Sequence, residues 1–384
     1  MLLHLIQDDL VFTDFVIEIF NTVAPNQNIY LLSNETHDHN IKYIRNISQI
    51  KYAPCGTNEF LSFFDKTKIK AVIIHGMTKQ AAEAIIKFGD DIHFHWMCTG
   101  YDLYGTYDEL NSCLLQPETK KVFRNNHSLG LLTDFLKRTI HKTTGIEMGH
   151  KQLFKSAMNK VKSCSMIIDE DFNLFKMLSG SKAKHVPFNY DYLENLVPIN
   201  LEPYNQGQHI LLGNSSSWTN NHLDAFPLLK DLHLYRADIK VYTPLSYGDE
   251  AYKKIIAIKG KTILGDQFVP MAEFLPLNEY TEILKKCSVA IMNHNRQQAL
   301  GNIVLLIWLG MRLYLQESNP VAQFLKRLGI IYFKLNEDFD LTKPQTLQPL
   351  SNNEVLANRK ALKNHYGKDV VFQRIKHLCE YLMH

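Results

Sequence analysis

Residues 288–308 read SVAIMNHNRQQALGNIVLLIW, and this stretch decides the fold class. It starts with a continuous apolar run, passes through a dense polar loop, and ends in an apolar segment with helical spacing. The pattern predicts a buried strand over 288–292 and a helix over 298–308. A strand that is apolar on both faces and leads directly into a helix is typical of a parallel sheet covered by helices on both sides.

The same alternation of apolar runs and helical patterns extends over most of the chain. In the first half the predicted strands are 2–6, 29–32, 71–75, 93–97 and 165–168, and the predicted helices between them are 11–23, 58–66 and 79–88. In the second half the predicted strands are 209–212, 239–242, 262–264, 288–292, 312–315 and 330–333, with helices at 221–229, 249–257, 277–285, 298–308 and 322–327. The sequence therefore predicts an α/β protein of two Rossmann-like, doubly wound domains that face an interdomain cleft.

The domain border is expected in the stretch 187–208, which is rich in proline, glycine and asparagine and shows neither helical nor strand periodicity. A length of 384 residues fits two such domains. We place an N-terminal domain at 1–195 and a C-terminal domain at 205–350. Residues 353–384 predict one long helix that packs back on the N-terminal domain.

Composition narrows the class of protein. Hydrophobic residues make up 45% of the chain, which is enough for a substantial core. The six cysteines form no Cys-x-x-Cys pair, which argues against a zinc ribbon or a disulfide framework. The first apolar run ends at Gln7-Asp8-Asp9, too early for a signal peptide or a membrane span, so we expect a cytoplasmic protein. A net charge of +3 is too small to suggest nucleic-acid binding.

Positive charge is concentrated in the basic segment, residues 120–162. It holds ten Lys or Arg and two acidic residues, and its stretch 129–140 keeps apolar residues at helical spacing. Apolar residues beside cations suit adsorption to anionic lipid headgroups. We therefore predict that the protein is peripheral on the inner face of the cytoplasmic membrane. The alternative is a core-facing helix with a solvated basic side.

Ligands of open parallel sheets bind at the carboxyl ends of the strands, so the loops there are the candidate sites. After the first strand of the C-terminal domain come Gly213, Asn214 and Ser215, small residues that let the backbone approach a diphosphate. The alternative is an ordinary turn that caps a helix. No P-loop or Gly-x-Gly-x-x-Gly pattern is present. The next strand contributes the candidates Tyr242, Tyr247 and Gly248.

The polar loop within 288–308 supplies the remaining candidates for binding a diphosphate and a sugar. Arg296 would neutralise a diphosphate leaving group with bidentate hydrogen bonds. Gln297, Gln298 and Asn302, together with Gly301, would hold sugar or ribose hydroxyls. The alternative makes Asn295 a helix cap and Arg296 a solvated side chain.

In the N-terminal domain, carboxylates and a histidine follow or lie on predicted strands. Asp8, His95 and Asp102 are candidates for a general base, and Asp9, Tyr101 and Tyr104 are candidates for acceptor binding. His93, His95 and Cys98 have donor atoms that suit a metal, but their alternation with Trp96 and Met97 favours a packed strand. The acids at 169–171 favour a helix start over a metal site. We therefore predict no metal and no other cofactor.

With these residues identified, the chain resembles the bacterial TDP-N-acetylfucosamine:lipid II N-acetylfucosaminyltransferases, also called 4-alpha-L-fucosyltransferases. The resemblance runs to about residue 335. It is carried by His95-Trp96 through Asp102-Leu103-Tyr104, by Gly213-Asn214-Ser215, and by Arg296 through Gly301 with Asn319-Pro320. The stretch Trp96-Met97-Cys98-Thr99-Gly100 departs from the family pattern, as does Gln7-Asp8-Asp9.

This resemblance implies a glycosyltransferase of the GT-B class, with the donor in the C-terminal domain, the acceptor in the N-terminal domain and no obligatory metal. The implied donor is a TDP-linked deoxyamino sugar similar to N-acetylfucosamine. The implied acceptor is a polyprenyl-diphosphate-linked saccharide or a related glycan. Because the departures lie in the acceptor half, the acceptor and the transferred sugar are the points at which this chain can differ from the family.

Two other functions remain open on the sequence alone. One is another sugar-nucleotide enzyme, similar to an epimerase, on the same scaffold. The other is a non-catalytic scaffold that binds sugar nucleotides or lipid.

Overall fold

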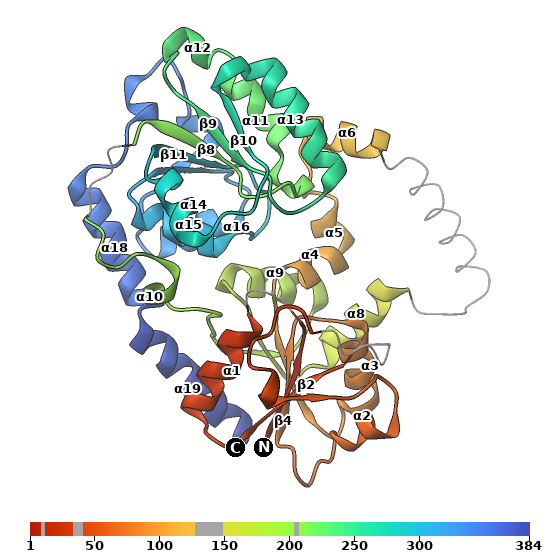
Figure 1. Cartoon of the computed structure of the whole chain (residues 1–384). Coiled ribbons are helices and arrows are strands. Elements are labelled where there is room, and N and C mark those ends of the chain that lie inside the picture. The colour runs from red at the N-terminus through yellow and green to blue at the C-terminus, as the bar shows by residue number, and fades with distance from the viewer. Residues whose placement is uncertain (9–11, 34–40, 127–148, 203–206) are drawn as a thin grey trace. The chain divides into compact units, whose positions relative to one another are not determined.

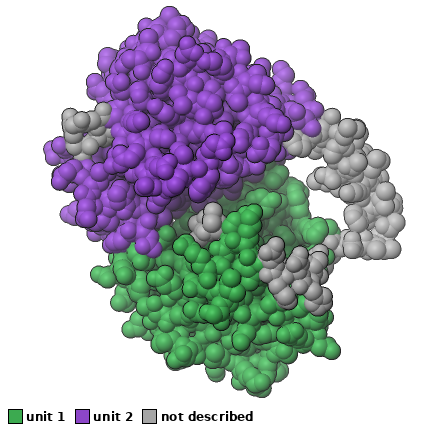
Figure 2. Space-filling model, in the orientation of Figure 1, with its two compact units in different colours: residues 1–111, 146–192, 366–384 green, residues 112–145, 193–365 purple. Residues whose placement is uncertain are grey.

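The structure is a computed structural model that describes residues 1–8, 12–33, 41–126, 149–202 and 207–384. The chain divides into two compact units (Figures 1 and 2). Unit 1 comprises residues Met1–Asn111, Ile146–Tyr192 and Tyr366–His384. Unit 2 comprises Ser112–Gly145 and Leu193–His365, so the border between Tyr192 and Leu193 falls inside the irregular stretch 187–208.

The described residues of unit 1 form a seven-stranded parallel sheet. Its strands are β1 (Leu2–Ile6), β2 (Asn28–Leu32), β3 (Ile50–Tyr52), β4 (Ala71–His75), β5 (His93–Met97), β6 (Ser163–Ser165) and β7 (Lys184–His185). They are arranged in the order β3-β2-β1-β4-β5-β6-β7, which reverses direction between β1 and β4. This is the topology of a Rossmann-like domain. Its sixth strand lies at 163–165, earlier than the predicted 165–168.

One face of this sheet is covered by α1 (Thr13–Val23) and by α19 (Lys368–Met383). Alternate strand residues such as Leu2, Ile6 and Ile73 pack there against apolar side chains of both helices. Figure 1 shows the red α1 beside the blue α19. The other described helices of unit 1 include α2 (Asn58–Ser62), α3 (Lys79–Phe88), α8 (His150–Lys160) and α9 (Asp169–Ser179).

The described residues of unit 2 form a six-stranded parallel sheet with the same topology. Its strands are β8 (His209–Leu212), β9 (Val241–Pro244), β10 (Phe268–Met271), β11 (Cys287–Met292), β12 (Arg312–Leu315) and β13 (Phe333–Lys334). Their order is β10-β9-β8-β11-β12-β13, so the reversal lies between β8 and β11. The predicted fold of two doubly wound domains is confirmed.

Helices α11 (His222–Leu229) and α13 (Glu250–Leu264) cover one face of this second sheet. Helices α14 (Leu277–Leu284), α15 (Leu300–Trp308) and α16 (Pro320–Arg327) lie on its other side (Figure 1). The strand predicted at 262–264 is wrong, because these residues are the last turn of α13. The helix ends at Gly265, whose positive φ of 55° suits glycine, and the strand follows it at 268–271.

Two further segments differ from the predicted domains. Helix α6 (Pro117–Asn126) is part of unit 2, where Val122 and Phe123 pack against its core. The single helix predicted at 353–384 is two helices, α18 (Asn352–Tyr366) and α19. Gly367 separates them with an extended ψ of 146°, which a continuous helix does not allow. Only α19 belongs to unit 1, and nearly all of α18 belongs to unit 2.

Candidate functional site

Three loops of unit 2 meet at the carboxyl ends of its strands. Because the strand order reverses between β8 and β11, this edge is where open α/β sheets bind ligands. The loop after β8 contains Gly213, whose backbone N–H donates to the carbonyl oxygen of Ile291 at 2.9 Å. The loops after β9 and β11 contain the other candidates for donor binding.

Asn214 connects all three loops through its side chain. Its Nδ2 donates to the Tyr247 hydroxyl at 2.7 Å, and its Oδ1 accepts a hydrogen bond from Gln298 Nε2 at 3.2 Å. Gln298 Oε1 in turn accepts from the Thr219 hydroxyl at 2.5 Å. The structure thus brings together residues that are far apart in the sequence, and a buried amide with these partners holds the loops in one arrangement.

Asn220 fixes the loop after β8 through hydrogen bonds of its side chain. Its Oδ1 accepts hydrogen bonds from the Asn214 N–H at 3.0 Å and from His294 Nε2 at 2.9 Å, while its Nδ2 donates to Ser215 Oγ at 3.1 Å. His294 is therefore the neutral tautomer with its hydrogen on Nε2. Burial, together with the nearby positive charge of Arg296 and with His222, lowers the pKa of His294 to about 3.

Two glycines let these loops approach each other closely. A Cβ on Gly213, which has a φ of +69°, would lie 2.6 Å from Nε2 of the buried His222. A Cβ on Gly248, with a φ of +122°, would lie 2.6 Å from the carbonyl carbon of Ser216. Both distances are shorter than any ordinary carbon contact, so the loops require glycine at these positions.

Arg296 lies on the loop after β11, shortly before helix α15, which begins at the same edge of the sheet. Arg296 and the partly buried Asn302 flank the start of the helix, and Gly301 in the first turn is exposed. The free N–H groups and the positive dipole end of a helix favour an anion there. Gln297 is buried, and its carbonyl oxygen accepts from Arg296 Nη1 at 3.5 Å. Tyr242 lies elsewhere, because its ring packs 5.5 Å from His209, the first residue of β8.

In unit 1, Asp102 is a structural cross-link. Its carboxylate is 5% exposed and accepts hydrogen bonds from Trp96 Nε1 at 2.8 Å, the Met77 N–H at 3.0 Å and the Thr99 N–H at 3.2 Å. Met77 and Thr99 follow β4 and β5, so Asp102 joins the ends of these strands. A carboxylate with its lone pairs occupied by protein donors is poorly placed to accept a substrate proton.

Asp8 is the more accessible carboxylate, although it also holds a loop. Its oxygens accept the backbone N–H groups of Lys42, Tyr43 and Ile44 at 2.7, 2.9 and 3.1 Å. The residue is partly exposed at the end of β1, beside the reversal of strand order in this sheet. Asp9 lies outside the residues that the structure describes.

His95 lies in the middle of β5 and is fully buried. Its ring nitrogens contact Ser163 Oγ and Ser165 Oγ, each at 2.8 Å, and burial lowers its pKa to about 3. Tyr104 is also buried and donates its hydroxyl to Asp171 at 2.6 Å. Tyr101 is 77% exposed. The structure therefore does not gather the acceptor candidates around one point as it gathers the donor candidates.

Comparison with known proteins agrees with this geometry. Residues 180–349 match the family described as 4-alpha-L-fucosyltransferase glycosyl transferase group 56. This chain is a glycosyltransferase. The match covers less than half of the chain but includes all three candidate loops, and it confirms the resemblance stated from the sequence. The glycosyltransferase transfers a sugar from a nucleotide-sugar.

Solved structures show the same fold as the glycosyltransferase at low sequence identity. The sucrose-phosphate synthase of Thermosynechococcus elongatus matches with a TM-score of 0.62 and 8% identity, over 99% of this chain and 98% of that one. The trehalose-6-phosphate protein from E. coli bound with UDP-2-fluoro glucose gives 0.61 and 9%, over 100% and 98%. A glycosyltransferase from Rickettsia africae gives 0.61 and 10%, over 100% and 98%. The fold is that of the GT-B glycosyltransferases.

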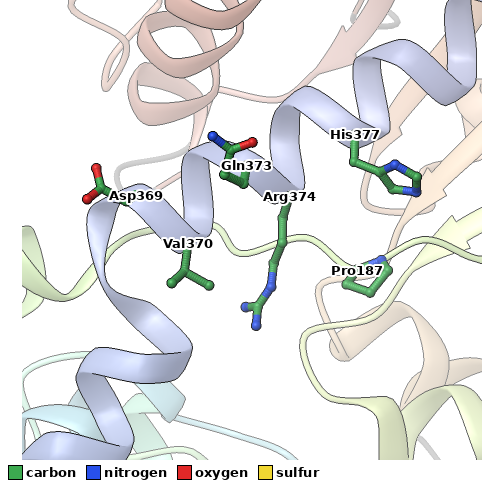
Figure 3. A pocket seen from close by; sticks show the side chains of 6 residues that line it. All are labelled: Pro187, Asp369, Val370, Gln373, Arg374 and His377. Atoms are coloured by element: carbon green, nitrogen blue, oxygen red, sulfur yellow. The ribbon is translucent and has the colours of Figure 1, made fainter.

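Unit 1 of the glycosyltransferase has a surface hollow of about 510 Å³. Figure 3 shows its lining side chains, five of which come from α19. Arg374 donates from Nη1 to Asn189 Oδ1. None of the candidate residues named from the sequence lines this hollow, which is lined by Pro187, Asp369, Val370, Gln373, Arg374 and His377.

The described residues of the glycosyltransferase contain no group of three or more His, Cys, Asp or Glu that could hold a metal ion. Nor do they contain a helix that is long and apolar enough to cross a membrane. The described part of the basic segment is divided between the two units. Lys151 and Lys160 of unit 1 form ion pairs with Asp108 and Asp90, and the predicted helix 129–140 lies outside the described residues.

Sequence reasoning missed the residues that support the donor loops from inside. Asn220, His222 and His294 are all fully buried. They stand in polar stretches that look like ordinary turns, and no local pattern marks which of their side chains face inward. Phe274 was also missed. It is 71% exposed on the loop after β10, at the same edge of the sheet, and an aromatic residue between a strand and a proline was the available signal.

Proposed function

We propose that unit 2 binds a TDP-linked deoxyamino sugar similar to N-acetylfucosamine, and that the enzyme transfers this sugar to a polyprenyl-diphosphate-linked saccharide or a related glycan. The family description and the resemblance in the sequence support the sugar class. The observation that carries the donor site is the convergence of three loops on Asn214, beside the start of α15.

In this proposal Arg296 and the first turn of α15 bind the diphosphate and stabilise the charge that develops on it as the sugar leaves. The backbone of Gly213, Asn214 and Ser215 approaches the phosphates from the other side. Gln297, Gln298 and Asn302 hold hydroxyls of the sugar or ribose. No metal ion is needed, because a guanidinium and a helix N-terminus supply positive charge.

Aromatic side chains offer a place for the nucleotide base. Tyr247 is 53% exposed although its hydroxyl is held by Asn214, and Phe274 is 71% exposed. Both follow strands that end side by side, since Met271 of β10 pairs with Pro244 of β9. Exposed rings fixed at a ligand-binding edge suit stacking with a base. Tyr242 and Gly248 act indirectly, by packing β9 and by allowing contact between the loops.

The acceptor is proposed to bind unit 1 at the carboxyl ends of β1 and β4. Among Asp8, His95 and Asp102, the partly exposed Asp8 is the best placed to accept the proton of an acceptor hydroxyl, whereas the other two are buried. Tyr101 is exposed and available for stacking on a sugar.

Contact with the cytoplasmic face of the membrane is proposed through the basic segment. Its described cations in unit 2 line a hollow of about 460 Å³ on α6, formed by Leu115, Pro117, Lys120, Lys121, Arg124 and Asn125. Cations at a surface next to apolar side chains favour anionic headgroups.

Product analysis tests the proposed reaction. The pure protein would be incubated with a TDP-linked N-acetylfucosamine and a polyprenyl-diphosphate disaccharide, and the products would be identified by mass spectrometry. The proposal predicts release of TDP together with a heavier lipid-linked product. Conversion of the donor to an isomeric nucleotide sugar, with no transfer, would favour an epimerase. Binding without any product would favour a scaffold.

A further inference from the structure

Gln116, just before α6, connects two of the donor loops of unit 2. Its backbone N–H donates to Asn221 Oδ1 at 2.9 Å. Its side-chain Nε2 donates to Asn293 Oδ1 at 2.8 Å and to Asn295 Oδ1 at 3.2 Å, and its Oε1 accepts from Asn293 Nδ2 at 3.1 Å. One side chain thus uses both of its polar ends on the loop after β11.

The two loops reach back to the same segment. Asn221 Nδ2 donates to the Leu114 carbonyl oxygen at 3.1 Å, and Asn295 Nδ2 donates to that of Cys113 at 2.8 Å. Asn221 follows β8 and Asn295 follows β11, so segment 113–116 spans the point where the strand order reverses. We call this set of bonds the amide clamp, formed by Gln116, Asn221, Asn293 and Asn295.

The clamp is rigidly supported. Asp224 on α11 accepts the backbone N–H groups of Glu118 and Thr119 at 2.8 and 3.0 Å, which caps the start of α6. The ring of Phe123 packs edge-on against Trp218 with centroids 5.0 Å apart. Helix α6 lies against α11. Gln116 is therefore fixed before any ligand binds.

The clamp also has a direct chain connection to the diphosphate site. Asn295 directly precedes Arg296 in the chain. Asn293 is 1% exposed, so its buried side-chain amide needs hydrogen-bond partners within the protein. Asn293 also accepts from Gln316 Nε2 at 2.6 Å and donates to the Asn221 carbonyl oxygen at 2.9 Å, so without the polar atoms of Gln116 it would keep these partners but lose its second donor and its second acceptor. An unsatisfied buried polar group costs about 1–3 kcal/mol, so the loop would rearrange. Such a rearrangement would move the backbone that carries Arg296.

We propose that Gln116 is a positioning residue for the nucleotide-sugar donor, which acts through Asn293 and Asn295 on the loop that carries Arg296. It holds this loop in the geometry that binds diphosphate, without touching the ligand itself. The proposal rests on the proposed donor site in unit 2. It adds a residue from outside the three loops and from outside the region that matches the family.

Calorimetric titration with TDP tests this role in the full chain. The variants are Gln116→Leu, which removes every side-chain hydrogen bond, and Gln116→Glu, which keeps the acceptor but removes the donor. Asn126→Ala, an exposed change on α6, is the matched control. We expect TDP affinity to fall about tenfold in Gln116→Leu, less in Gln116→Glu and not at all in the control.

A double-mutant cycle with Arg296→Ala separates positioning from a general loss of stability. If Gln116 acts through Arg296, adding Gln116→Leu to the Arg296→Ala variant weakens TDP binding by less than about twofold. The proposal would be overturned if the double variant lost TDP affinity by the product of the two single fold-losses, or if Gln116→Leu bound TDP as tightly as the wild type. If Gln116→Leu does not fold, Gln116→Glu carries the same cycle. Wild-type protein that binds no TDP would overturn the donor site and this inference with it.

Discussion

His294 Nε2 donates a hydrogen bond to Asn220 Oδ1 across 2.9 Å, which joins the loops that follow β8 and β11. The same oxygen accepts the N–H of Asn214, so one amide holds two donors in a fully buried position. The change Asn220→Leu leaves both donors without an acceptor. We predict a loss of about 2–4 kcal/mol in the free energy of unfolding, measured by urea denaturation. Asn278→Ala, on the exposed side of α14, is the control and should change little.

Gly213→Ala tests the close approach of the first donor loop. The new Cβ would lie 2.6 Å from His222 Nε2 and would force a φ of +69° on alanine. We predict a loss of about 1–3 kcal/mol in stability and weaker binding of nucleoside diphosphate, measured by denaturation and calorimetry. Gly105→Ala has open space around its Cβ and serves as the control. Equal stability of the two variants would contradict this account.

Asp102→Ala should mainly reduce the free energy of unfolding, because Asp102 is a structural residue in this account. The buried carboxylate supplies the acceptor for the Trp96 indole and for two backbone N–H groups. Removing it leaves these donors unsatisfied, so we predict a loss of about 3 kcal/mol or more. Asp8→Asn keeps one acceptor oxygen for the backbone N–H groups of Tyr43 and Ile44, so it should cost less stability than Asp102→Ala and should reduce transfer. The opposite pattern would assign the catalytic role to Asp102.

Buried histidines make the stability of the protein depend on pH. Burial lowers the pKa of His4, His95, His222 and His294 to about 3, below the usual value of 6.5 in the unfolded chain. Between these values the unfolded chain binds protons that the folded chain excludes. Stability is therefore full above pH 6.5 and falls as the pH decreases toward 3, by up to about 1.4 kcal/mol per pH unit for each group.

Denaturation at pH 7.5, 6.0 and 5.0 checks this prediction. The variant His95→Gln should reduce the dependence on pH, because it removes one of the buried groups. Gln373→Ala, an exposed change on α19 that removes no titrating group, should leave the dependence unchanged. Stability that is constant from pH 7.5 to 5.0 would contradict the burial of neutral imidazoles.

The sequence predicted the fold because buried parallel strands are short apolar runs. The strands at 2–6, 71–75, 93–97, 209–212 and 312–315 are confirmed residue for residue. The error at 262–264 arose because β-branched residues in the last turn of α13 resemble a strand. The position of α6 could not be predicted, since the cap that Asp224 provides and the contact with Trp218 join residues about 100 positions apart.

The candidate site was predictable only in part. Loops after strands could be located, because the carboxyl edge of a parallel sheet collects them, and Asn214, Tyr247 and Gln298 do lie together. Which polar side chains face inward could not be predicted. Asp102 and His95 resemble catalytic residues by type, but their partners come from neighbouring strands and saturate them.

Binding of nucleoside diphosphates to unit 2 is the central claim, and a thermal-shift comparison of TDP, UDP, GDP and CMP tests it most directly. Each would be measured with wild-type protein, with Arg296→Ala, and with Arg236→Ala, whose ion pair with Asp238 lies before β9, away from the donor loops. A bound nucleotide raises the melting temperature according to its occupancy. We predict that TDP gives the largest shift in the wild type and in Arg236→Ala, and that the shift is strongly reduced in Arg296→Ala. No shift with any nucleotide, or an equal shift in Arg296→Ala, would contradict the account.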